Sequence, residues 1–163
     1  MEKTEAVTIR KVLTVENMLL SVGFLFPLLF NSAQIVNGAV VNTVLFLSAS
    51  RLKWNRLILI SILPSIGALA NGFLFGKFTI FLVYFLQFIW IGNYLLMRLS
   101  KTDMLLAVAV KTIILFSVAY IFVSFHFVPK IFLTAMGFLQ LATALIGGTL
   151  AFGIATLIRS AHD

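Results

Sequence analysis

The 163-residue chain is 61% hydrophobic and only 10% charged, whereas soluble domains are about 45–50% apolar and about 25% charged. A water-soluble fold of this size could not bury so much apolar surface, so the composition predicts an integral membrane protein in the cell membrane. The net charge of +7 does not indicate nucleic acid, because the basic residues lie scattered beside hydrophobic segments, as in membrane proteins. The absence of cysteine excludes disulfides and thiolate chemistry.

The apolar segments favour helices over the strands of a membrane barrel. In barrel strands, polar and apolar residues alternate over about ten residues, whereas residues 57–63 and 78–91 are apolar almost throughout. A helix needs about 20 apolar residues to cross the bilayer, so a chain of this length has room for about six or seven crossings. We therefore expect an all-α integral membrane protein, a bundle of six transmembrane helices.

The expected elements follow one another with short connections. Residues 1–14 mix charges with isolated apolar residues and lack the apolar core and cleavage site of a signal peptide, so they form a cytoplasmic lead-in. The transmembrane domain covers residues 15–159. A basic loop around Trp54 separates the second span from the third, and Pro129 ends the fifth. The six expected spans are 15–30, 35–50, 57–76, 78–97, 104–127 and 131–158.

The distribution of Lys and Arg predicts that both termini are cytoplasmic. With the N-terminus inside, the outer loops hold only Lys77 and Lys130, and the inner segments hold nine basic residues. Cytoplasmic loops carry an excess of Lys and Arg, and an odd number of spans would break this alternation. The nine inner residues are Lys3, Arg10, Lys11, Arg51, Lys53, Arg56, Arg98, Lys101 and Arg159.

Polar side chains inside the expected spans or at their ends are the candidates for a functional site, because polar groups are costly at depth in the bilayer. Most are neutral amides, which donate and accept hydrogen bonds without the cost of an ion in hydrocarbon. Several fall towards the outer face, which favours a polar cavity there; alternatively, the amides only join helices to one another. The polar residues are Asn31, Gln34, Asn37, Asn42, Asn71, Gln87, Asn93, Gln140 and Thr143.

Lys111 is the one ionised residue well inside an expected span. It lies about two turns from the inner end of the fifth span, roughly 10 Å deep. We expect it either to extend its ammonium back to the headgroups or to pair with Glu16, which enters the first span from the same side. Both roles are favoured over contact with a substrate.

Small residues mark faces along which helices approach closely. Gly147, Ala151 and Ala155 repeat at four-residue spacing in the sixth span, and residues 68, 72 and 76 do so in the third. Such faces either pack within the monomer or meet a partner subunit. For both stripes we expect packing within the monomer.

The sequence lacks the groups that catalysis would need. Glu16, at the edge of the first span, is the only acidic residue in any span, which excludes an acidic proton relay or cation site. There is no metal-ligand cluster, no Ser/His/Asp set and no phosphate-binding loop with a lysine. We therefore expect no catalytic residue, metal or cofactor, and neither an enzyme nor a primary pump.

Four stretches carry a resemblance to a known family: QIVNGAVVN at 34–42, LPSIGALANG at 63–72, FIWIGN at 88–93 and MGFLQLATALIGG at 136–148. Their order and spacing resemble the S components of energy-coupling factor (ECF) transporters, in particular a branch whose substrate is not assigned. The resemblance covers about residues 15–155. It implies a membrane subunit that captures a vitamin or similar micronutrient in a pocket towards the outer face. By this resemblance, the pocket or its lining contains Asn37, Asn42, Asn71, Asn93 and Gln140.

The resemblance also implies partners. Besides the lipid bilayer and a small-molecule substrate, these are a separate ECF transmembrane subunit and two ATPases, to which the substrate is handed inward. S components often dock through an Ala-x-x-x-Ala pattern in the first helix, whereas the first span here has Ser21 and Gly23 as its small residues. The alternative is a structural or assembly membrane protein of the six-helix type, in which the amides only lock helices together.

Overall fold

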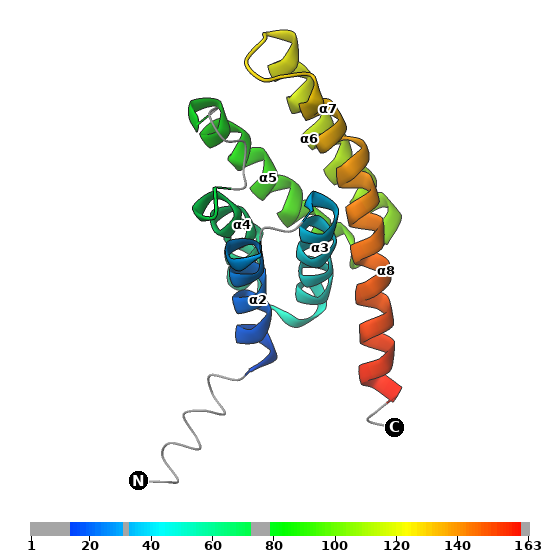
Figure 1. The fold of residues 1–163 in the computed structure, drawn as a ribbon. Helices are drawn as coiled ribbons and strands as arrows, with labels where there is room; N and C mark the ends of the chain where they lie inside the picture. The colour runs from blue at the N-terminus through cyan, green and yellow to red at the C-terminus, as the bar shows by residue number, and fades with distance from the viewer. Residues whose placement is uncertain (1–13, 31–32, 73–78, 161–163) are drawn as a thin grey trace, which may run out of the picture.

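The computed structural model describes residues 14–30, 33–72 and 79–160, and these fold as helices without a strand (Figure 1). The all-α prediction is therefore confirmed. Six helices result for this part of the chain if α7 and α8 are counted as one interrupted helix. The helices are α2 Val15–Leu29, α3 Gln34–Arg51, α4 Trp54–Ala70, α5 Thr79–Leu99, α6 Met104–Ser124, α7 Ile131–Met136 and α8 Phe138–Ser160.

Each expected span overlaps one of these helices or, for the sixth span, the pair α7 and α8. Residues 73–76 of the expected third span, the start of the fourth at Phe78 and the lead-in up to residue 13 lie outside the described residues. The sixth span is interrupted at Gly137, which separates α7 from α8. A Cβ atom at Gly137 would lie 2.8 Å from the Phe116 ring, so α6 passes too close to this point for a larger residue.

Helix α6 ends at Ser124, before the end at 127 that the sequence predicts. His126 has a φ of 60°, and a right-handed helix does not continue through such a left-handed residue. The amides of His126 and Phe127 donate to the carbonyls of Val123 and Phe122 at 2.9 Å each, which is the Schellman pattern of a helix end. The terminating signal is this turn and not Pro129.

Two of the described helices are long and apolar enough to cross a membrane, judged by length and composition. They are Met104–Ser124, with a mean hydropathy of 2.3, and the α7–α8 stretch Ile131–Ser160, with 2.0. Helices α2, α4 and the Val83–Leu99 part of α5 are apolar but shorter. Large apolar side chains also cover the outside of the bundle; Ile131 and Phe152, for example, are each 71% exposed.

The bundle is built from three helix pairs, α2 with α4, α5 with α6 and α3 with α8 (Figure 1). The α3–α8 contact is close: a Cβ atom at Gly147 would lie 2.6 Å from the Cβ of Asn42. Gly147 and Ala151 are buried, so the expected packing within the monomer is confirmed for them, although Ala155 is exposed. In the other stripe Ala68 is buried and Gly72 is exposed, and residue 76 lies outside the described residues.

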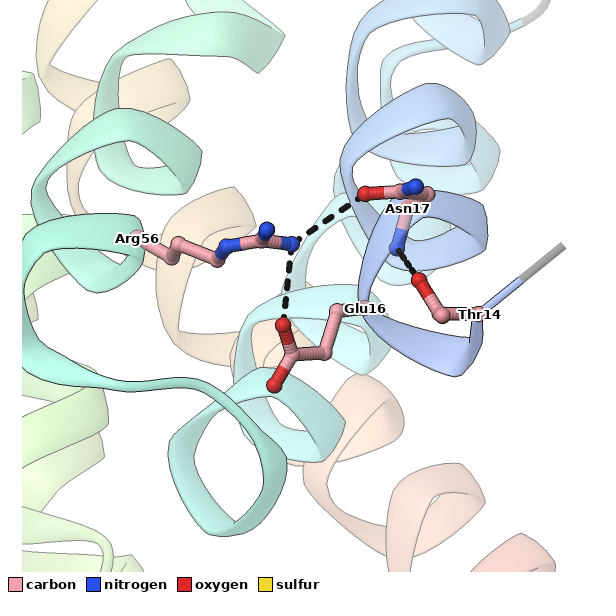
Figure 2. Close-up of polar contacts among 4 residues, drawn as sticks. All are labelled: Thr14, Glu16, Asn17 and Arg56. Atoms are coloured by element: carbon pink, nitrogen blue, oxygen red, sulfur yellow. Dashed lines mark hydrogen bonds and ion pairs between the residues drawn. The ribbon is translucent and has the colours of Figure 1, made fainter. Parts of the chain in front are cut away.

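Helices α2 and α4 are joined by close packing and by an ion pair. A Cβ atom at Gly23 would lie 2.7 Å from Ile60, so this small residue of the first helix is used inside the monomer. Figure 2 shows Arg56 reaching across to α2, where its Nη1 lies 2.9 Å from Glu16 Oε2 and 3.1 Å from Asn17 Oδ1. Glu16 is thus paired with Arg56 and not with Lys111.

Candidate binding cavity

A cavity of about 320 Å³ lies within the bundle, with walls contributed by α2 to α8. Its volume is at the small end of the range for small-molecule sites, about 300–1,000 Å³, and such sites combine apolar walls with a few polar groups. The apolar wall includes Leu115, Phe132 and Met136, which belong to a buried cluster between α5, α6 and α7. The amide and cationic side chains that line the cavity are Gln34, Asn37, Asn42, Asn93, Lys111 and Gln140.

The cavity begins in the half of the bundle where α2 ends and where α3 and α7 begin, and it extends past the middle of α5 and α6. Pro27 near the end of α2, Gln34 at the start of α3 and Ile131 at the start of α7 all line it. Along α3 the lining continues from Gln34 to Asn42, a distance of about 12 Å at about 1.5 Å per residue. The Arg56–Glu16 pair stands at the starts of α4 and α2, away from this half.

Four of the five site residues expected from the sequence line this one cavity: Asn37, Asn42, Asn93 and Gln140. They come from α3, α5 and α8 and are brought together only by the fold. The fifth, Asn71, is not among the lining residues. It caps the end of α4, and its Nδ2 donates to the carbonyl of Pro27 at 3.2 Å.

Asn37 has a related contact, because its Nδ2 donates to the carbonyl of Phe30 at 3.3 Å. The last carbonyls of a helix have no donor within that helix. Asn37 and Asn71 thus supply donors from α3 and α4 to the C-terminal end of α2. Asn37 also lines the cavity, whereas the Asn71 side chain bonds only to this backbone within the described part of the chain.

Lys111 connects three helices through a chain of hydrogen bonds. Its Nζ donates to Asn42 Oδ1 at 2.6 Å, and Asn42 Nδ2 donates to Thr143 Oγ1 at 3.3 Å. Thr143 in turn donates to the carbonyl of Gln140 at 3.2 Å. The side chains of Lys111, Asn42 and Thr143 are only 2–3% exposed. Because Asn42 binds Thr143 through its amide nitrogen, its oxygen is directed to the ammonium.

Both roles expected for Lys111 from the sequence are wrong. The ammonium does not extend to the headgroups, since the residue is 3% exposed and bonded to Asn42. It does not pair with Glu16, whose partner is Arg56. The aliphatic part of the side chain passes Gly92, where a Cβ atom would lie 3.4 Å from Lys111 Cγ. Such a Cβ atom would make an ordinary van der Waals contact, so the Lys111 side chain packs along α5 at this point.

The opposite wall is held by contacts between α4 and α5. Asn93 Nδ2 donates to the carbonyl of Ser61 at 2.9 Å, and Trp90 Nε1 donates to Ser65 Oγ at 2.6 Å. Ser65 and Asn93 both line the cavity. In the described part of the chain, Asn93 Oδ1 receives no hydrogen bond. Asn93 Oδ1 is therefore available in this wall as an acceptor, and the bond from Nδ2 to Ser61 fixes the orientation of the amide.

The two glutamines that line the cavity differ from the asparagines. Neither the Gln34 nor the Gln140 side-chain amide has a hydrogen-bond partner among the residues that the structure describes. An amide has two donors and one acceptor group to offer. Gln34 and Gln140 are thus the cavity groups most available to a bound molecule.

No protein-family model, curated protein or solved structure matches the chain. The chemistry of the cavity therefore has to be argued from its own residues. Within the described ranges, no group of three or more His, Cys, Asp or Glu side chains is placed to hold a metal ion. The polar groups of the cavity are suited to hydrogen bonding and to holding one negative charge.

Proposed function

We propose that this protein is a multi-pass membrane subunit that binds a small, vitamin-like micronutrient in the cavity, as the S component of an ECF-type importer. The energy for transport comes from partner ATPase subunits. The observation that carries the proposal is the cavity of about 320 Å³ in which amides from α3, α5 and α8 converge. Two glutamines without a hydrogen-bond partner among the described residues, together with mostly apolar walls, fit a ligand with both polar and apolar parts.

The arrangement of the helix ends supports six crossings with cytoplasmic termini. Figure 1 shows the start of α2 and the end of α8 at the same end of the bundle. The short connections α3–α4 and α5–α6 carry Lys53 and Lys101, and Arg51 is the last residue of α3. The positive-inside rule assigns such connections to the cytoplasm. The cavity begins in the other half, so this orientation places that part of it towards the outside.

The partner module has to meet the subunit on a surface that does not include Gly23 of α2. Gly23 is buried and packs against Ile60 of α4, so it is not free to receive another helix. Docking through α2 in the manner of an Ala-x-x-x-Ala face is therefore not part of the proposal.

Ligand retention and cavity filling test the proposal. The protein is purified in mild detergent, and native mass spectrometry looks for a small molecule that stays bound; thermal-shift assays then cover a vitamin panel. Ala135→Phe places a ring in the cavity lining and should abolish retention, whereas the matched change Thr134→Phe, at an exposed position of α7, should preserve it. The absence of any retained or stabilising ligand, or equal binding by the two variants, would contradict the proposal.

The alternative, a structural or assembly protein, is favoured by Asn71 and Asn93, which donate to backbone carbonyls of other helices. Such bonds join helices and need no ligand. Gln140→Ala separates the two functions. Because the Gln140 amide has no partner in the described part of the chain, its loss should leave stability unchanged in a purely structural protein. In a binding subunit it should weaken ligand affinity.

A further inference from the structure

Lys111 places one basic amine in the wall of the cavity. The residue is 3% exposed, and its single hydrogen-bond partner in the described part of the chain is the neutral oxygen of Asn42 at 2.6 Å. None of the residues that line the cavity is Asp or Glu. The ion pair between Arg56 and Glu16 is formed elsewhere. The cavity therefore contains a basic amine with no acidic partner among the described residues.

A buried ion without a partner is destabilising, and neutral side chains of similar size usually replace it at no loss. The contacts of Asn42 are arranged to hold this one in place. Asn42 binds Thr143 through Nδ2 and so directs Oδ1 to the ammonium. An ammonium has three donors, and Asn42 occupies one. Two donors remain for a group that enters the cavity.

We infer that the ligand is a small monocarboxylic acid whose carboxylate binds the Lys111 ammonium. This inference rests on the proposed binding function and adds the chemical class of the substrate. A carboxylate carries one negative charge, which the single ammonium neutralises. A phosphate monoester carries about 1.5 to 2 negative charges at neutral pH, and Lys111 is the only cation that lines the cavity.

The other residues that line the cavity indicate which chemical groups the rest of the ligand contains. Gln34, Gln140 and the free oxygen of Asn93 offer donors and acceptors for neutral polar groups such as amides, ureas or hydroxyls. Leu115, Phe132 and Met136 offer an apolar surface. An acid with a polar middle and a short apolar part matches this distribution, within the volume of about 320 Å³.

The test compares acids with neutral analogues of nearly the same shape. The probes are pantothenate against pantothenol, nicotinate against nicotinamide, and biotin against biotin amide, each titrated into the full-length protein in detergent. Any acid identified by native mass spectrometry joins the set with its methyl ester. A charge-assisted hydrogen bond makes the acid of a binding pair roughly tenfold to a hundredfold tighter than its neutral partner. Lys111→Met should reduce this preference to about one, and Lys111→Arg should keep part of it; the control Lys101→Met, at an exposed loop position, should not change it.

The outcomes separate this inference from the proposed function. Binding of neutral probes as tightly as the acids, or an acid preference that survives Lys111→Met, would refute the carboxylate and leave the binding function standing. Tighter binding of phosphate monoesters than of the corresponding acids would refute it in favour of a dianion. No binding of any probe and no retained molecule would refute both proposals. Should Lys111→Met fail to fold, the acid-to-neutral comparison in the unmodified protein still decides the question.

Discussion

The close contact between α3 and α8 predicts that replacing glycine by alanine has different effects on stability at two positions of α8, Gly147 and Gly153. A Cβ atom at Gly147 would lie 2.6 Å from Asn42 Cβ, 2.8 Å from the Thr43 amide nitrogen and 2.9 Å from the Ala39 carbonyl oxygen. Two of these are backbone atoms, so α3 and α8 have to separate by several tenths of an ångström. At Gly153 a Cβ atom would meet nothing within 4 Å.

The magnitude follows from two terms. Replacing Gly by Ala in a helix gains about 1 kcal/mol at either position, and this gain cancels when the two variants are compared. Overpacking costs about 1–3 kcal/mol, and only Gly147→Ala incurs it. Gly147→Ala should therefore unfold below Gly153→Ala by roughly 2–12 °C, at roughly 2–4 °C per kcal/mol for a chain of this size.

The assay is thermal unfolding of the purified protein in detergent, followed by the fluorescence of Trp54 and Trp90. Because unfolding of such proteins is often irreversible, both variants are scanned at the same rate and only their difference is interpreted. Equal melting temperatures, or a higher value for Gly147→Ala, would refute the close α3–α8 contact. Since Asn42 faces Gly147, the same variant should also weaken binding of the ligand, and Gly153→Ala should not.

Three further predictions concern other contacts. Arg56→Met removes the half-exposed pair with Glu16 and should lower stability by at most about 1 kcal/mol, and the difference from the unmodified protein should shrink in high salt. Asn93→Leu removes a buried bond to the α4 backbone and should lower stability by about 0.6–2 kcal/mol, measured by thermal unfolding; an unchanged stability would contradict that bond. Because the chain has no cysteine, Lys130→Cys and Lys101→Cys report orientation: in intact cells an impermeant maleimide should label the first and not the second, and the reverse pattern would contradict the proposed topology.

Composition and pattern were sufficient for the helices, because continuous apolar runs and basic connections are local properties of the chain. They were also sufficient to choose amides such as Asn42 and Gln140 as candidates, because polar groups in apolar segments are rare. The predicted contacts of the Lys111 side chain were wrong for a physical reason. The number of residues from the helix end gives the depth of Lys111, but the direction of its side chain depends on Asn42, which belongs to another helix.

Asn71 shows how the structure separates two uses of one residue type. Which amide meets the exposed carbonyls at the end of α2 depends on where α4 ends beside it, and no local pattern contains that information. Asn71 gives its donor to that backbone, whereas Gln34 and Gln140 keep theirs in the described part of the chain. Some of the amides therefore join helices. The side-chain amides of the two glutamines and two donors of the Lys111 amine have no such role among the described residues, and all of them lie around one cavity. Polar groups without partners are costly in an apolar bundle. Helix packing does not explain these cavity groups, whereas a bound acid would explain them by forming hydrogen bonds with them.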